Sequence, residues 1–574
     1  MAKKVDRIEL RSEKWISLHG RVPGDPAAKQ MLSSKYQEPY YCDKTAPCNE
    51  ACPAGEDIVE YIYLASQGRL REAWELIRQE NPFPGVCGRV CPHPCEDECN
   101  RAELGGAISI HALERFLADY GRTLPRPRPK ARPQRTKQVA IVGSGPAGLS
   151  CAYQLARMKY GVTVFEALPK AGGMMRAGIP RYKLPRAVLN QEIADIKAQG
   201  VEIRTNTVVG RDITLDQLRS FEALFVATGF HQSEKLGIPG EEAKGVFSSV
   251  ELLKRLNLGE NIRIGERVAI IGGGNASVHV ARSLLRRGCR PIIVCRHPQA
   301  QMPAIGGEIA SVLEEGIEII PQVYPERILV QGGRVKGMEL VRVKPSKKNK
   351  SGHGRPVHIK GCNFLLKVDG IVLAMGELPD LSFLPEDIET EARGILVDRG
   401  CFTSKEGVFA GGDVATGAGT VAHAIGSGKR AALAIDRYMK GEDFFSIQER
   451  PGTARIRPKE VDPSLVRCKD LNLAYLEEEA QVPLRVRPVE TRTKGFQEVC
   501  VGYKEEEAVA EAQRCISCGV CNMCENCMIF CPDIAISSRR GKFGYKIDYE
   551  HCTGCGICVQ ECPRNAMSMR EVLR

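Results

Sequence analysis

The stretch VAIVGSGPAGLS, residues 139–150, decides the fold of this chain. An apolar strand runs directly into Gly143-x-Gly145-x-x-Gly148, and a helical pattern follows. Gly143 permits the tight turn, Gly145 lets the backbone approach a pyrophosphate, and Gly148 allows close packing of helix on strand. The next strand, VTVFE, ends in Glu166, where an acceptor for a ribose hydroxyl belongs. A glycine turn is common by itself, but strand, turn, helix and acid together predict a dinucleotide site.

A second unit of the same kind, VAIIGGGNASVHVARSLLRRG at residues 268–288, lies inside the first. Gly272, Gly274 and the small Ser277 hold its fingerprint positions. Its next strand, PIIV, is followed by the basic Arg296 rather than by an acid, which suits a 2′-phosphate better than a bare ribose diol. Two nested dinucleotide folds imply two dinucleotides bound face to face, and hydride transfer between a nicotinamide and a flavin is their natural use. NADPH is favoured over NADH.

Composition limits the class of protein. The 574 residues are 43% hydrophobic and 26% charged, which is typical of several globular α/β domains. The polar opening of the chain does not resemble a signal peptide, and no run of about 18 apolar residues occurs. We therefore expect a cytoplasmic protein without a membrane span. The net charge is +11, but Lys and Arg are spread along the chain, so we expect an acidic redox partner rather than nucleic acid.

The 24 cysteines are concentrated at the two ends of the chain. Seven lie between Cys42 and Cys99, and ten lie between Cys515 and Cys562. Reduced thiols are expected in the cytoplasm, so these cysteines are predicted to be metal ligands rather than disulfides.

The N-terminal cysteines have helical spacing. Cys48-x3-Cys52 is followed by Cys87 and then by Cys91-x3-Cys95-x3-Cys99. Spacings of four place thiols on one side of a helical turn, which favours an iron-sulfur cluster, with structural zinc as the competing interpretation.

The C-terminal tail carries two complete runs of the bacterial two-cluster ferredoxin pattern, CxxCxxCxxxCP. In this pattern the fourth cysteine of each run binds the other cluster. The predicted ligand sets are Cys521, Cys524, Cys527 and Cys562 for one cluster, and Cys552, Cys555, Cys558 and Cys531 for the other. Cys515 and Cys518 extend the series of CxxC spacings and are extra thiols. They either compete for a cluster or bind none.

Several further motifs carry a family resemblance. They are GGMMRAGIPRYKLP, FVATGFHQSEKLGIPGE, VCRHPQAQMPA, VLAMGELPD and GVFAGGDVATGAGTVAHAIGSGK. From about Tyr41 to Tyr438 the chain resembles the small subunit of bacterial glutamate synthase, the N-terminal half of dihydropyrimidine dehydrogenase, and NADP-dependent ferredoxin oxidoreductase subunits of similar build. Its tail resembles that of iron-sulfur flavoproteins of anaerobic and sulfur metabolism, including the NAD(P)H oxidoreductase that serves dissimilatory sulfite reductase.

The resemblance implies FAD on the first fold, with Gly173 and Asp413 beside its ribityl chain. His279 stands where the family commonly has Asp. The expected cofactor contacts are Gly143, Gly145, Pro146, Ala147, Gly148, Glu166, Gly173, Asp413 and Val421 for FAD, and Gly272, Gly274, Asn275, Ser277 and Arg296 for the nicotinamide nucleotide.

The resemblance also implies two interleaved 4Fe-4S clusters near the N-terminus, so three or four clusters are expected in all. One cluster would use Cys52, Cys91, Cys95 and Glu114. The other would use Cys42, Cys48 and Cys99, with its fourth ligand unassigned and Cys87 the nearest spare thiol.

The fold class is therefore predicted as multidomain α/β. The expected domains are a helical iron-sulfur domain (1–121), a Pro-rich basic linker (122–137), an FAD-binding Rossmann-like domain (138–266 and 367–440), a nested NAD(P)H-binding domain (267–366), a connecting arm (441–504) and an α+β ferredoxin-like domain (505–574).

The predicted function is that of an NAD(P)H:acceptor oxidoreductase. Electrons pass between NAD(P)H, FAD and the clusters, to or from a ferredoxin or a larger redox enzyme. The sequence leaves open whether the chain forms a homo-oligomer. The cofactors carry the chemistry, so no catalytic residue is expected. The alternative is a non-catalytic electron-relay or docking subunit of a larger complex, an interpretation that His279 keeps open.

Overall fold

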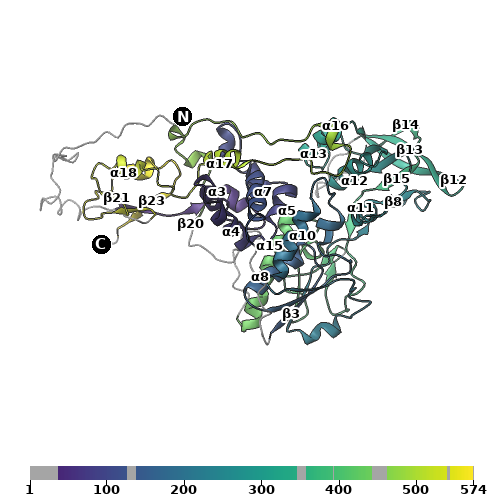
Figure 1. Cartoon of the computed structure of the whole chain (residues 1–574), viewed down its shortest axis with the longest axis horizontal. Coiled ribbons are helices and arrows are strands. Elements are labelled where there is room, and N and C mark those ends of the chain that lie inside the picture. Colours follow the sequence, from purple (N-terminus) through teal and green to yellow (C-terminus); the bar gives the residue numbers. More distant parts are fainter. Residues whose placement is uncertain are drawn as a thin grey trace.

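The computed structural model describes residues 37–125, 137–344, 357–391, 393–442, 462–539 and 543–572. Most of the predicted basic linker lies outside these residues. Figure 1 shows an elongated molecule with the cysteine-rich tail at one end, a helical domain next to it, and two α/β units beyond. No helix within the described ranges combines the length and apolarity that a bilayer crossing requires.

The helical domain forms around the apolar faces of short amphipathic helices, with Tyr61, Phe83 and Leu113 fully buried in its core. Cysteines lie at or next to the ends of several helices, where the backbone turns and can present sulfur. The helices are α2 (Pro47–Ala51), α3 (Ile58–Ser66), α4 (Leu70–Glu80), α5 (Pro84–Val90), α6 (Pro94–Asp97) and α7 (Ile110–Gly121).

The first α/β unit is a five-stranded parallel sheet in the order β19-β6-β3-β4-β5. Its central strand β3 leads into the glycine turn and helix α8, and α15 packs beside α8. A Cβ on Gly428 of α15 would lie 2.0 Å from the Ala147 carbonyl oxygen, so only glycine permits this approach. The bounds are β3 (Gln138–Val142), α8 (Pro146–Arg157), β4 (Gly161–Phe165), β5 (Glu202–Arg204), β6 (Ala223–Val226), β19 (Val408–Ala410) and α15 (Val421–Lys440).

The second α/β unit is a parallel sheet in the order β11-β10-β9-β15-β8, backed by the antiparallel sheet β12-β13-β14. Strands β8 and β15 lie outside the range 267–366 that was predicted for this unit. They pair within this sheet and not with the first sheet. The bounds are β8 (Val246–Ser248), β9 (Arg267–Ile271), α12 (Asn275–Leu285), β10 (Arg290–Cys295), α13 (Gly306–Glu314), β11 (Glu318–Pro321), β12 (Val323–Gln331), β13 (Arg334–Lys344), β14 (Val357–Leu366) and β15 (Gly370–Leu373).

The tail is smaller than predicted. Helix α17 (Glu505–Gln513) packs on α3 and α7 and contributes Ala508 and Ala512 to the helical domain's core. The ferredoxin-like part follows, and its last strand β23 (Met567–Glu571) pairs with β1 (Gln37–Tyr41) from the start of the described chain. Its other elements are α18 (Asn526–Ile529), β21 (Ile536–Ser538), β22 (Tyr545–Ile547) and α19 (Ile557–Gln560).

Two segments of the predicted connecting arm are held against other parts of the molecule. Strand β20 (Asp462–Leu465) pairs with β2 (Lys44–Thr45), and α16 (Val489–Arg492) lies beside α13 at the end of the molecule away from the tail (Figure 1). Within α16, Arg492 is buried and contacts Glu315 (Nε–Oε1, 3.1 Å) and Glu314 (Nη2–Oε2, 2.6 Å). The arm therefore links the second α/β unit to the cysteine-rich end.

Candidate cofactor and cluster sites

A cavity of about 440 Å³ opens at the carboxyl end of the first sheet. Eight of the nine residues predicted for FAD line it, and the ninth, Gly148, lies beneath it as a packing contact. The eight are Gly143, Gly145, Pro146, Ala147, Glu166, Gly173, Asp413 and Val421.

The backbone around this cavity fits a dinucleotide. Gly143 has φ +102°, and a Cβ there would lie 2.4 Å from the Ala227 carbonyl oxygen. A Cβ on Gly173 would lie 2.6 Å from the Gly145 Cα, whereas a Cβ on Gly145 would meet nothing within 4 Å. The glycines thus bring three backbone segments together and leave open space in front of the α8 N-terminus, where a pyrophosphate belongs.

Two carboxylates face this cavity, the buried Glu166 and the half-buried Asp413. Glu166 accepts hydrogen bonds from the backbone N–H groups of Ser144 (3.0 Å) and Leu168 (2.7 Å) and from the Ser144 hydroxyl, so its orientation is fixed. Burial raises the pKa of Asp413 to about 6, although the Gly419 N–H donates to its Oδ1 at 3.2 Å. Both groups can accept hydrogen bonds from ligand hydroxyls.

A second cavity, of about 350 Å³, lies at the carboxyl end of the second sheet. Gly272, Gly274, Asn275 and Arg296 line it, as predicted for the nicotinamide nucleotide, and Arg296 is exposed at its edge. A Cβ on Gly274 would meet nothing within 4 Å, which repeats the open space of the first site. Ser277 is fully buried under the turn, so its contribution is to close packing.

The two cavities adjoin, because Ala276 and Glu377 line both. Sequence reasoning did not single out Glu377, although it lies in the quoted motif VLAMGELPD just after β15. Burial and the nearby Glu234 raise its pKa. The two cavities therefore share part of their lining.

His279, the departure from the family pattern, lines the first cavity. Its Nε2 is buried and has no hydrogen-bond partner among the described residues. Burial, with Lys183 nearby, lowers its pKa to about 3, so the imidazole is neutral at physiological pH.

The structure brings Cys52, Cys91 and Glu114 together beneath the flavin fold. Glu114 Oε1 accepts a hydrogen bond from Asn81 Nδ2 (3.0 Å), and burial, Glu56 and Cys91 hold the pKa of Glu114 well above its usual value. Cys95 neighbours Cys52 and Cys91 as well. A buried carboxylate among thiols is costly without a cation, so this donor set fits the predicted iron-sulfur cluster. Cys87, the spare thiol, lies beside Glu114 and Cys91.

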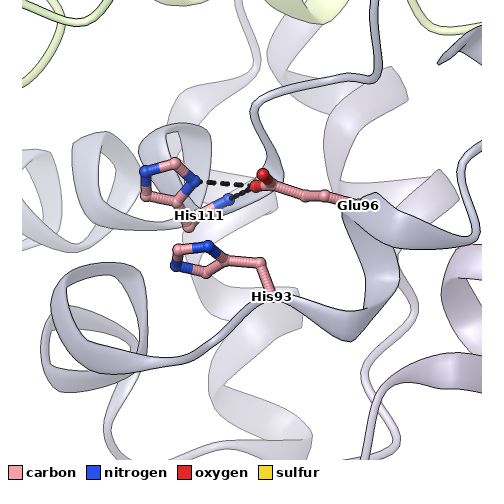
Figure 2. A group of neighbouring side chains, drawn as sticks. All are labelled: His93, Glu96 and His111. Carbon is pink, nitrogen blue, oxygen red and sulfur yellow. Dashed lines mark hydrogen bonds and ion pairs between the residues drawn. The ribbon is translucent and has the colours of Figure 1, made fainter. Parts of the chain in front are cut away.

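Next to these thiols is a stacked pair of imidazoles (Figure 2). His93 has φ +61°, and its ring lies 3.9 Å from that of His111, centroid to centroid. Glu96 Oε1 contacts His111 Nδ1 at 2.7 Å and accepts the His111 backbone N–H at 2.8 Å. These ligand-type atoms lie within 4.8 Å of one another, but the carboxylate already caps α7. The group therefore joins the loop of Cys95 to the helix of Glu114.

The second N-terminal set differs from the predicted one. Cys48 and Cys99 line a small cavity whose other two thiols are Cys515 and Cys518, and Cys42 is not among its lining residues. Instead, the Cys42 backbone N–H bonds to the Ala566 carbonyl oxygen (3.2 Å), at the ferredoxin-like tail. The reason is topological, because residues 37–41 are drawn into the tail as strand β1.

In the tail, the two cysteine runs cross as the ferredoxin pattern requires. Cys562 lies with the first run, next to Cys521 and Cys527, and Cys531 lies with the second, next to Cys558. Two backbone N–H groups point at these sulfurs, from Ala535 to Cys531 and from Ala566 to Cys562, each at 3.3 Å. Such N–H···S bonds tune cluster potentials.

Comparison with known proteins agrees with this geometry. A model of the pyridine nucleotide-disulphide oxidoreductase family matches residues 137–428, one described as dihydropyrimidine dehydrogenase domain II, 4Fe-4S cluster, matches 28–124, and a 4Fe-4S binding domain matches 545–568.

Among curated relatives, the chain is 42% identical to the NADP(+)-dependent formate dehydrogenase subunit beta of Moorella thermoacetica, over 89% of this chain and 75% of that protein. It is 36% identical to the NADPH-Fe(3+) oxidoreductase subunit beta of Geobacter sulfurreducens, over 83% of this chain and 76% of that protein. It is 33% identical to the glutamate synthase [NADPH] small chain of Escherichia coli, over 68% of this chain and 88% of that protein.

Proposed function

We propose an electron route for this chain, which belongs to the pyridine nucleotide-disulphide oxidoreductase family and is an NAD(P)H-dependent oxidoreductase with FAD and 4Fe-4S clusters. The route runs from the nicotinamide cavity to the flavin cavity, through the helical domain and into the tail, or in reverse. When bound, the cofactors supply hydride and single-electron transfer, and the protein supplies their placement.

The adjoining cavities are the observation that carries this proposal. Ala276 and Glu377 line both, which supports binding of the nicotinamide and the flavin next to each other for hydride transfer. On the flavin side, His279 adds a neutral imidazole whose buried Nε2 has no hydrogen-bond partner among the described residues. A buried, neutral hydrogen-bonding group there orients a ligand without adding charge to the site.

The helical domain is seated directly on the flavin fold. A Cβ on Gly426 of α15 would lie 2.0 Å from the Pro53 carbonyl oxygen, next to the predicted ligand Cys52. Three residues further along the same helix, the buried Lys429 Nζ bonds to Glu80 Oε2 (2.8 Å) and to the Ala54 carbonyl oxygen. Helix α15 begins at the flavin cavity, so one rigid element spans the two sites.

We assign Cys52, Cys91, Cys95 and Glu114 to the cluster nearest the flavin. The tail clusters are assigned to the two crossed ferredoxin sets predicted from the sequence. NADPH is proposed as the nicotinamide substrate, because Arg296 stands at the edge of the second cavity where a 2′-phosphate belongs and the relatives named above are NADP- or NADPH-linked.

The tail is the proposed exit to a protein partner, a ferredoxin or a larger redox enzyme. Its surface exposes Ile529, Phe530, Ile534 and Phe543, and Cys524 and Cys555 are exposed nearby in the sequence. Exposed apolar side chains beside cluster ligands favour docking of another redox protein. Two of the relatives are named as beta subunits, which supports a role inside a larger assembly.

Two full-length variants test this exit. Ile529→Asp with Ile534→Asp is expected to leave NADPH-driven dye reduction intact and to lower electron exchange with a ferredoxin at least tenfold, because a charged patch no longer docks. Leu365→Asp, at an exposed apolar position on β14, is the matched control. Full-rate exchange in the double variant would instead make the helical domain the exit.

A further inference from the structure

Four thiols from three distant segments line one small cavity between the helical domain and the tail. Cys48 lies in α2, Cys99 follows α6, and Cys515 and Cys518 follow α17. The remaining lining is mostly apolar: Pro47, Val59, Ile62, Ile108, Ile110 and Ile516, with Asn100 and Arg101. Soft donors that converge in an apolar wall are the surroundings of an iron-sulfur cluster.

The loop that carries Cys515 and Cys518 is held in place from both sides. Gly519 has φ +76°, and a Cβ there would lie 2.6 Å from the Lys44 carbonyl oxygen. The Lys44 N–H donates to the Gly519 carbonyl oxygen (2.9 Å), and the Gly519 N–H donates to the Arg564 carbonyl oxygen (2.7 Å). The approach of these two thiols to Cys48 is thus built into the fold.

Two of the four sulfurs accept N–H groups. Asn100 Nδ2 donates to Cys518 Sγ and the Ser517 backbone N–H donates to Cys515 Sγ, each at 3.4 Å. In the tail, backbone N–H groups likewise donate to Cys531 Sγ and Cys562 Sγ, each at 3.3 Å.

Sulfur spacing separates a cluster from zinc. In the described residues, three ligand-type atoms come within 4.8 Å of one another only in the histidine–glutamate group of Figure 2, and not in any cysteine set. Four thiolates about 2.3 Å from one zinc ion lie within about 4 Å of each other. No cysteine set among the described residues has the close spacing of a zinc site, so an iron-sulfur cluster is the metal group that we infer here.

We propose that Cys48, Cys99, Cys515 and Cys518 hold a 4Fe-4S cluster that joins the C-terminal segment to the helical domain. The inference deepens the proposed function and rests on its iron-sulfur N-terminal domain. It replaces Cys42 as a ligand and assigns the two cysteines that the sequence leaves spare.

This cluster supplies the middle of the electron route. Cys52, a proposed ligand of the cluster nearest the flavin, lies four residues after Cys48, and Cys521, of the first tail cluster, lies three residues after Cys518. On each side, a ligand of this cluster therefore lies three or four residues from a ligand of the next cluster. It also crosslinks residues more than 400 positions apart, so cluster loss is expected to loosen α17 from the helical domain.

The test is the iron and acid-labile sulfide content of full-length holoprotein, with the EPR spectrum after reduction by dithionite. Wild-type protein is expected to hold about 16 iron atoms per chain, from four clusters. Cys515→Ser and Cys518→Ser should each hold about 12 and lose one EPR component, while Cys42→Ser keeps about 16. Cys362→Ser, at an exposed thiol on β14, is the general control.

Cys518→Asp is a second variant that still tests the assignment if the serine variants do not fold. Carboxylate oxygen can replace a thiolate as a ligand, so this variant is expected to keep about 16 iron atoms with one EPR component shifted. Full iron with an unchanged spectrum in both Cys518 variants overturns the proposal, as does a loss of four iron atoms in Cys42→Ser with full iron in Cys515→Ser. Wild-type protein without N-terminal clusters would instead refute the proposed function itself.

Discussion

Removing the arm's anchor on the nicotinamide fold tests whether the arm is a rigid connection. Arg492→Ala deletes the contacts to Glu314 and Glu315 described above. Glu315 is fully buried but keeps Arg286 (2.8 Å) and Arg282 (2.7 Å), so no buried charge is left unpaired. The expected cost is therefore that of charged hydrogen bonds, about 1.5–3 kcal/mol, rather than the 3–5 kcal/mol of an orphaned buried ion.

Hydrogen exchange at the arm measures this cost locally. The Val499 N–H bonds to the Tyr182 carbonyl oxygen (2.9 Å) and reports on whether the arm is docked. A cost of 1.5–3 kcal/mol corresponds to exchange roughly 10- to 150-fold faster at that amide. Arg485→Ala, which removes a partly exposed pair between Arg485 of the same arm and Glu507 of α17, should change exchange less than about fivefold. Equal effects of the two substitutions would show that Arg492 does not anchor the arm.

Further predictions concern the cofactors, the buried network and the tail. Purified protein should carry one FAD and roughly 12 to 16 iron atoms per chain, and zinc in their place would contradict the cluster assignments. Arg296→Ala should raise the KM for NADPH at least tenfold and leave that for NADH nearly unchanged; an equal rise in both would remove Arg296 from the 2′-phosphate site. Glu315→Gln should cost 3–5 kcal/mol at pH 7, measured by denaturant unfolding. Deleting residues 520–574 should preserve dye reduction better than deleting 505–574, because α17 stays in place.

Acid provides an independent check on Glu315. Burial alone would raise its pKa, but hydrogen bonds from Arg286 and Arg282 hold it at about 2, below the ordinary value of 4.5. A lowered pKa stabilises the fold above the ordinary pKa, and the contribution is lost as the pH falls from about 4.5 towards 2. Wild-type protein should lose its advantage over Glu315→Gln in this pH window. A gap between the two that does not narrow there would contradict the assignment.

The parts of the molecule encoded by local patterns were predictable. The turns at Gly143 and Gly272 line the cavities that the two fingerprints imply, because strand, turn and helix are contiguous in sequence. The crossed ferredoxin runs follow from a spacing that repeats within 42 residues, from Cys521 to Cys562. Family resemblance placed Glu114 beside Cys91, which an isolated glutamate on a helix does not reveal.

Long-range assembly was not predictable from spacing. Cys515 and Cys518 meet Cys48 only because α17 packs on α3, and no local period encodes that contact. The family resemblance implied Cys42 as a ligand in the helical domain, whereas strand pairing between β1 and β23 brings it to the tail. The domain boundaries at 267, 366 and 505 shifted for the same reason, since strands and helices join the unit that they pack on.

In the proposed electron route, one chain carries electrons between NADPH and clusters at its far end. Anaerobic titration of full-length holoprotein with NADPH, followed by flavin absorbance and by EPR on the same samples, tests it most directly. We expect flavin absorbance to bleach and reduced-cluster signals to appear, including the component lost in Cys518→Ser. Flavin bleaching with no cluster signal, or no bleaching with either NADPH or NADH, would contradict it.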